Sequence, residues 1–334
     1  MERRISGAAP VVIAVTVLIV GCAPSSPSES PAPSPSETAT HTVVVIGDSI
    51  PYNSPDDCPG CTGFADSYAE ALGATEGETY TAINRSRHDG ARTADILDEV
   101  QSGSLDAVLS DAEVVIVSAG YNDQAPYEQG DCYDESINLD TTDGAASALL
   151  ATTPECIATQ TAATGATLAS VLDGVRERAP DATLYALGSY NSWTGWSEFD
   201  ALAPEIERPA SQTIAAVLGA WRTVVCAEVE RVDGTCVDLL TAFNGADGLT
   251  PAGDLLAADY NHPSQKGNDL IRDLLLENRP ADHTPDCCGP ARSAPSLCLS
   301  FSLSSAREVA SAPRAGRPWP PQRCCAPRGV PPGR

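Results

Sequence analysis

The chain has 334 residues, a formal net charge of −25 and a single lysine. This strong negative charge argues against nucleic acid or anionic lipid headgroups as the main partner. Residues 41–280 are numerous enough for one large α/β domain with a full core.

The first 22 residues have the pattern of an export signal. Charged residues at positions 2–4 precede an apolar stretch, residues 8–20, that is too short for a typical membrane-spanning helix. The stretch ends in Leu-Ile-Val-Gly-Cys, which resembles the lipobox of bacterial lipoproteins and implies that Cys22 is lipidated. A plain signal peptide with an incidental cysteine is the alternative. We therefore expect the protein at the extracellular face of the bacterial cytoplasmic membrane, held by its lipid anchor only, or partly secreted.

Two further segments are predicted to be disordered from their composition. Residues 23–40 are rich in Pro, Ser and Thr without periodicity, which is typical of a flexible tether. Residues 281–334 contain seven arginines and three acidic residues, in contrast to the acidic chain before them. This composition predicts a disordered basic tail, and a shifted reading frame would also produce it.

Apolar runs alternate with amphipathic stretches throughout residues 41–280. The runs predict strands at residues 43–46, 80–84, 113–118, 183–188 and 236–240. The stretches predict helices at residues 64–72, 157–179, 211–232 and 265–277, and one that begins near residue 93 with Thr93 as a candidate N-cap. Such alternation predicts a doubly wound, flavodoxin-like α/β sandwich with a central parallel sheet of about five strands.

Six cysteines fall within residues 41–280, an even number in a chain that we expect to be exported. This combination favours disulfides, although six cysteines allow many pairings. Sequence neighbours suggest Cys58–Cys61, Cys132–Cys156 and Cys226–Cys236, each closing a loop. The Cys-x-x-Cys spacing at residue 58 also suits a metal or redox site, but no second such pair and no nearby histidine supports zinc. We therefore expect no metal.

The first predicted strand runs into Gly47-Asp48-Ser49. A serine at the carboxyl end of such a strand lies where open α/β sheets bind ligands, although Gly, Asp and Ser are also ordinary turn residues. Three further segments follow in order: HDGARTADIL around Gly90, Gly120-Tyr121-Asn122-Asp123, and Asp259-Tyr260-Asn261-His262-Pro263. Together the four segments resemble the SGNH (GDSL-type) hydrolase superfamily over most of residues 41–278.

The resemblance implies a serine esterase and assigns roles to its motif residues. Ser49 is the expected nucleophile, because a hydroxyl reacts at neutral pH only when a neighbouring base removes its proton. The side-chain amide of Asn122 and the backbone N–H groups of Gly90 and Ser49 are the expected oxyanion hole. Preset donors of this kind typically contribute about 10²–10³ each to the rate. Asp48 and Asp123 are expected to hold their turns.

His262 is the expected base, because an imidazole titrates near neutral pH. Asp259 lies three residues earlier, so one turn of chain can bring its carboxylate to Nδ1, where it would fix the tautomer and stabilise the imidazolium. The other histidines, His41, His88 and His283, have no carboxylate in a comparable turn.

The sequence leaves the reaction and the substrate open. We expect a monomeric esterase that acts on a small ester or an acylated glycan through an acyl-serine intermediate, without a cofactor and without nucleic acid as a partner. An O-acyltransferase on the same residues and a non-catalytic glycan-binding lipoprotein are the alternatives.

Short acyl chains are the expected substrates. The insertions at residues 51–63 and 124–142 are polar and aromatic residues make up 5% of the chain, which leaves little adaptable apolar surface. Trp193 and Trp196 follow the fourth predicted strand and are candidates for a small apolar wall or a sugar-stacking platform. Burial against the last helix is the alternative for both.

Overall fold

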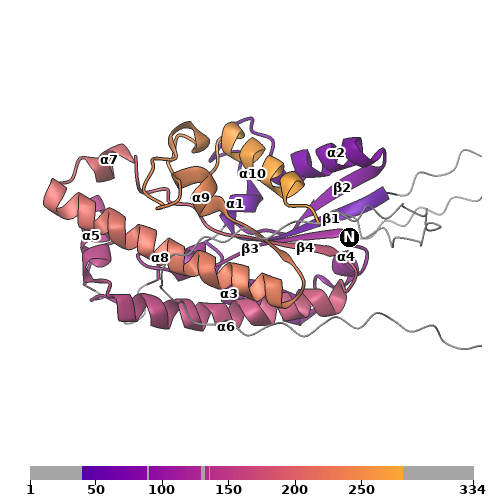
Figure 1. The fold of residues 1–334 in the computed structure, drawn as a ribbon, viewed down its shortest axis with the longest axis horizontal. Coiled ribbons are helices and arrows are strands. Elements are labelled where there is room, and N and C mark those ends of the chain that lie inside the picture. The colour runs from indigo at the N-terminus through magenta and orange to yellow at the C-terminus, as the bar shows by residue number, and fades with distance from the viewer. Residues whose placement is uncertain (1–39, 89, 129–131, 135, 281–334) are drawn as a thin grey trace, which may run out of the picture. The chain divides into compact units, whose positions relative to one another are not determined.

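The computed structural model describes residues 40–88, 90–128, 132–134 and 136–280. The expected signal peptide, Cys22, nearly all of the expected tether and the basic tail lie outside these residues. Five parallel strands form one sheet in the order β2-β1-β3-β4-β5 (Figure 1). The strands are β1 (Thr40–Gly47), β2 (Thr79–Asn84), β3 (Val114–Ser118), β4 (Thr183–Leu187) and β5 (Thr235–Val237). This order confirms the predicted doubly wound, flavodoxin-like fold.

Helices cover both faces of the sheet (Figure 1). One face packs against α2 (Phe64–Glu76), α9 (Leu239–Asn244) and α10 (Gln265–Glu277). The other packs against α3 (Thr93–Ser102), α4 (Asp106–Ser110), α6 (Pro154–Arg178) and α8 (Pro204–Arg231). The remaining helices are α1 (Ser49–Tyr52), α5 (Thr142–Ala151) and α7 (Ser197–Asp200), with short 3₁₀ turns η1 (Tyr121–Asp123) and η2 (Gly253–Leu255).

The β-branched run of β1 explains why this strand lies inside the sheet. Val43 and Val45 pack into the core on the α2 and α10 side, whereas Val44 and Ile46 pack into the core on the α6 and α8 side. All four side chains are 0% exposed. A strand that is apolar on both faces is stable only when helices cover both, so the run itself selects the three-layer arrangement.

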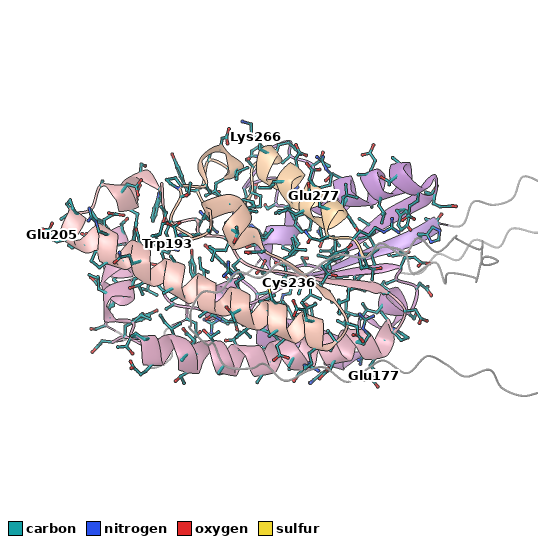
Figure 2. All side chains as sticks on the ribbon, in the orientation of Figure 1. Glu177, Trp193, Glu205, Cys236, Lys266 and Glu277 are labelled. Atoms are coloured by element: carbon teal, nitrogen blue, oxygen red, sulfur yellow. A yellow bond between two sulfur atoms is a disulfide. The ribbon has the colours of Figure 1, made fainter. Side chains whose placement is uncertain are left out.

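Several element boundaries differ from the predictions. The strand predicted at residues 236–240 ends at Val237, because the Asp238 side chain accepts the backbone N–H of Thr241 and starts α9. Helix α8 begins at Pro204 rather than residue 211, and Glu205 lies in its first turn (Figure 2). Pro209, a residue that usually ends helices, hides this longer helix in the sequence. Helix α5 was not predicted, and β1 begins one residue inside the expected tether.

The structure forms three disulfides, Cys58–Cys61, Cys132–Cys156 and Cys226–Cys236. These are the pairs of sequence neighbours that the sequence suggested. Among the described residues, no helix is long and apolar enough to cross a membrane.

The three disulfides should differ in their contributions to stability. Their sequence separations are 24 for Cys132–Cys156, 10 for Cys226–Cys236 and 3 for Cys58–Cys61. Where a bridge acts by restricting the unfolded chain, replacing both cysteines by serine should lower the free energy of unfolding by about 3.5, 2.8 and 1.9 kcal/mol in that order. Denaturant unfolding of the three double variants measures these losses. The reverse order would contradict the prediction.

Candidate active site

Ser49 lies where the order of the strands reverses, between β1 and β3. Open α/β sheets bind their ligands at such a switch point, outside the carboxyl ends of the strands. Gly47 pairs with Ser118 of β3, and a Cβ on Gly47 would lie 2.3 Å from the Ser118 carbonyl oxygen. Glycine at residue 47 therefore lets the two strands meet directly below Ser49, the first residue of α1.

Asp48 holds the turn that presents Ser49. Its Oδ1 accepts the backbone N–H of Ile50 at 3.0 Å and the hydroxyl of Ser118 at 3.5 Å. The side chain is buried, and this burial raises its pKa to about 7, although the hydrogen bond from Ile50 opposes the effect. Asp48 is thus an internal part of the turn rather than a group exposed to substrate.

The expected oxyanion donors come from two adjacent segments. The Asn122 amide in η1 donates one N–H to the Ala91 carbonyl at 3.0 Å, which joins η1 to the segment after Gly90. An amide nitrogen carries two hydrogens, so the second remains available to an oxyanion. Gly90 has a φ of +71°, in the left-handed region that favours glycine. The structure therefore brings the Gly90 and Asn122 segments together.

Packing behind η1 fixes its position. Gly120 has a φ of +95°, and a Cβ there would lie 2.0 Å from the ring of Trp221 in α8. Trp221 is fully buried, and its Nε1 donates to the Ala119 carbonyl at 3.2 Å. Asp123 accepts both the backbone N–H and the hydroxyl of Thr93 at 2.9 Å. Thr93 is therefore the first residue of α3 and not its N-cap, because its hydroxyl is committed to η1.

Asp259 uses both carboxylate oxygens to place His262. Oδ2 lies 2.6 Å from Nδ1 of the His262 ring, and Oδ1 accepts the backbone N–H of Asn261 at 3.0 Å and of His262 at 3.1 Å. Burial alone would raise the pKa of Asp259, but the hydrogen bonds from the His262 ring and the two N–H groups lower it below its ordinary value. Asp259 is thus held as a carboxylate, the form that stabilises an imidazolium.

The other ring nitrogen of His262, Nε2, is buried and has no hydrogen-bond partner among the described residues. An imidazole whose Nδ1 is hydrogen-bonded to a carboxylate and whose Nε2 is unbonded can accept a proton at Nε2 and so act as a general base. Among the same residues, the Ser49 hydroxyl also makes no hydrogen bond. The bond between nucleophile and base is therefore not made in this structure, and such bonds often tighten only with substrate.

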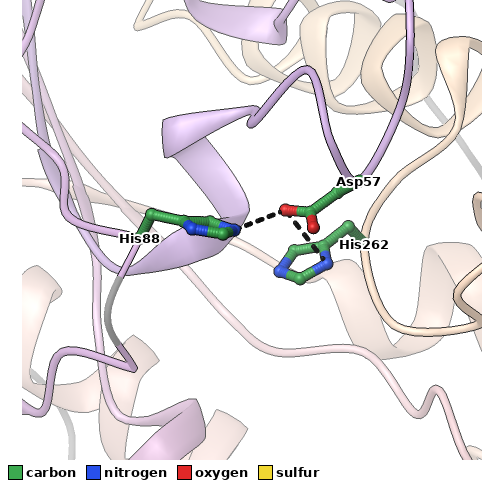
Figure 3. A group of neighbouring side chains, drawn as sticks. All are labelled: Asp57, His88 and His262. Carbon is green, nitrogen blue, oxygen red and sulfur yellow. Dashed lines mark hydrogen bonds and ion pairs between the residues drawn. The ribbon is translucent and has the colours of Figure 1, made fainter.

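Sequence reasoning missed two neighbours of His262. Asp57 Oδ2 lies 3.4 Å from His262 Nδ1 and 2.8 Å from His88 Nε2, so one carboxylate oxygen serves two imidazoles (Figure 3). The donor atoms of these three side chains could hold a metal ion. Asp57 and His88 are far from each other and from His262 in the sequence, so no spacing pattern links them. The one sequence signal is that His88 lies two residues before Gly90, an expected residue of the active site.

Helix α10 brings the Asp57 loop to the His262 segment. Asn268 is fully buried; it accepts the Phe64 N–H at 3.0 Å and donates to Asn53 Oδ1 at 3.3 Å and to the Ser264 carbonyl at 3.0 Å. Residues 53–64 are therefore tied to the start of the helix that follows His262.

Trp193 and Trp196 belong to a separate apolar cluster. Trp193 is only 8% exposed, and the two rings pack edge to face at 5.7 Å. Their cluster includes Phe199 and residues of α5 and α8, and no described residue of α10 belongs to it. Figure 2 labels Trp193. Trp193 is therefore buried, but beside α8 rather than against the last helix.

This arrangement defines an α/β protein with a serine, a carboxylate-bound histidine and an amide donor at the switch point of its sheet. The model of the GDSL-like lipase/acylhydrolase family matches residues 45–270, and the chain belongs to this family. Family membership makes the protein a hydrolase that acts on esters.

Solved structures share the fold. The lipase Lip_vut3 from a goat rumen metagenome is 16% identical with a TM-score of 0.50, covering 71% of this chain and 97% of its own. The extracellular lipase from Streptomyces rimosus is 19% identical with a TM-score of 0.50, covering 72% of this chain and all of its own. No curated protein sequence matches the chain.

The Asp259→Asn variant should retain part of its activity, because Asp57 remains near Nδ1 to orient the ring. We expect kcat/KM to fall by about 10²-fold, less than the roughly 10⁴-fold loss that the same change causes in a Ser-His-Asp triad. Adding Asp57→Asn should remove most of the remainder, and Asp56→Asn, at the exposed neighbouring carboxylate, is the matched control. A double variant as active as Asp259→Asn would contradict this role of Asp57.

Proposed function

We propose that the protein is an extracellular, lipid-anchored serine esterase that forms an acyl-serine intermediate at Ser49. The observation that supports it best is the His262 ring, with Nδ1 on Asp259 and a buried, unpartnered Nε2. His262 would take the proton of Ser49 as the hydroxyl attacks the ester carbonyl. It would return the proton to the departing alcohol, and then repeat the cycle with water.

Oxyanion stabilisation would come from three donors. The N–H of Ser49, the N–H of Gly90 and the second amide hydrogen of Asn122 would bind the oxygen that becomes negative in the tetrahedral intermediate. The bond from Asn122 to Ala91 supports the pairing of these donors, because it holds the amide beside the Gly90 segment before substrate arrives. Such donors need no reorganisation during the reaction.

The substrates we propose are short-chain or carbohydrate-linked esters. The insertions at residues 51–63 and 124–142 are polar, which leaves little apolar surface for a long acyl chain. Tyr52, three residues after Ser49, and Tyr260, two residues before His262, are 45% and 42% exposed. Exposed rings at these two positions suit a sugar face better than the buried Trp193 does.

An organophosphonate probe should label Ser49 and no other serine. Ser49→Ala should abolish labelling and ester hydrolysis, and His262→Ala should lower kcat by on the order of 10⁴–10⁶, as for other serine hydrolases. Ser110→Ala, at an exposed serine of α4, is the control.

A glycan-binding protein would not be labelled, and an acyltransferase would be labelled but would prefer a sugar hydroxyl to water. More than a tenth of the activity in folded Ser49→Ala would refute the mechanism.

The acyl preference should be short. Each buried CH₂ contributes at most about 0.8 kcal/mol, and this gain ends where the pocket ends. We expect kcat/KM for p-nitrophenyl esters to peak between acetate and hexanoate. Tyr52→Ala and Tyr260→Ala should raise KM several-fold on acetylated polysaccharide and less on p-nitrophenyl acetate, with the exposed Leu150→Ala as control. An optimum at laurate or longer would contradict the proposal.

The lipid anchor is proposed from the sequence around Cys22, which lies outside the described residues. The membrane fraction should contain a mature chain that begins at a diacylglyceryl-modified Cys22, detectable by mass spectrometry. Cys22→Ser should move the protein into the medium, because a chain without the lipid-modified cysteine lacks the proposed membrane anchor. Native protein found wholly in the medium and cut elsewhere would refute the anchor.

A further inference from the structure

Three loops bring Asp57, His88 and His262 together beside the candidate active site. Figure 3 shows the Asp57 carboxylate between the two rings, with Oδ2 at 2.8 Å from His88 Nε2 and 3.4 Å from His262 Nδ1. One donor atom from each of the three side chains lies within 4.8 Å of the other two. Two imidazoles and a carboxylate are the ligand types that zinc takes in open, three-ligand protein sites.

The local charge favours a cation. His262 Nδ1 faces two carboxylates, Asp259 at 2.6 Å and Asp57 at 3.4 Å, but a ring nitrogen carries at most one proton. The same Asp57 oxygen also faces His88. Asp57 and Asp259 thus bring two carboxylates to one ring nitrogen, and a divalent ion would balance their charge.

One of the separations already fits zinc. With ligand bonds of about 2.0–2.1 Å, the corners of a tetrahedron lie about 3.4 Å apart, which matches the separation between Asp57 and His262. The 2.8 Å between Asp57 and His88 is shorter, so this pair would have to move apart when an ion binds. The ligand loops are anchored through their backbones: Asp57 donates to Ser54 O at 3.1 Å, and Arg87, beside His88, donates to Gly47 O at 3.0 Å. Anchored ligands lose little conformational freedom when an ion binds.

We propose that Asp57, His88 and His262 bind a zinc-type divalent cation and that the bound ion switches off ester hydrolysis. Coordination through Nδ1 would occupy the lone pair there, so the single proton of the neutral ring would move to Nε2. A protonated Nε2 has no lone pair with which to accept the Ser49 proton. The ion would also replace the hydrogen bond to Asp259. The switch, though not the binding, rests on the proposed role of His262 as the base.

Calorimetric titration of the full chain with zinc chloride tests the binding. Cysteines beyond residue 280 can also bind zinc, so the informative quantity is the difference between variants. Wild type should bind one more zinc ion than His88→Gln. The control variant His41→Gln should match wild type, because His41 lies at the opposite end of β1 from the site and is bonded to Glu113. His88 is exposed, so its replacement leaves the core intact. Equal binding by wild type and His88→Gln would overturn the proposal.

Hydrolysis of p-nitrophenyl acetate tests the switch. Zinc should inhibit wild type reversibly, EDTA should restore activity, and magnesium, which prefers oxygen ligands, should have no effect. His88→Gln should need at least about tenfold more zinc for half inhibition, since even the loss of a ligand's partner commonly weakens a metal site that much. Equal zinc sensitivity in the two enzymes would refute the switch. No hydrolysis by zinc-free wild type would instead refute the proposed function and leave the binding result standing.

Discussion

The close contact between the ends of β1 and β3 is the constraint on which the site depends. Gly47 has no room for a side chain against the Ser118 carbonyl, and Asp48 turns inward to bond both Ser118 and the start of α1. Ser49 therefore lies at the carboxyl edge of the sheet, where η1 also follows β3. Burying Asp48 is unfavourable for a carboxylate, which is why its pKa rises to about 7. Its hydrogen bonds offset part of that cost and keep the turn closed.

Carboxylates that accept backbone N–H groups also hold the other loops of the site. Asp123 binds the backbone N–H and hydroxyl of Thr93, and Asp259 binds two backbone N–H groups as well as the His262 ring. In each case a carboxylate satisfies backbone donors that a loop would otherwise leave to water. The acidic composition of the chain, which predicts little beyond solubility, thus supplies the groups that hold its active-site loops. Because the loops are fixed by short-range bonds, the parallel strands need only end at the same edge to bring them together.

The sequence predicts the elements that carry a strong apolar pattern and fails where side-chain chemistry decides. The five strands and α10 follow directly from β-branched runs and helical spacing. Thr93 looks like an N-cap in sequence, but its hydroxyl bonds Asp123, and Asp238 starts a helix where apolar Leu239 and Leu240 suggest a strand. Within the site, Ser49, Asn122 and His262 belong to motifs with fixed spacing, whereas Asp57 and His88 are far apart in the chain. The bonds of Asn268 between the Asp57 loop and α10, which no sequence pattern predicts, bring this loop to His262.

The carboxylates around His262 favour two roles that oppose each other, general-base catalysis and metal binding. A general base gains strength from carboxylates at Nδ1, because they stabilise the imidazolium that forms when Nε2 takes a proton. The more negative charge gathers at Nδ1, however, the more strongly the same atom attracts a metal ion in place of its proton. Asp259 alone, at 2.6 Å, serves the first role. Asp57 and His88 add little to it that Asp259 does not already provide, but they complete a set of metal ligands around Nδ1. The second carboxylate and the second imidazole are therefore better explained by a cation than by catalysis alone.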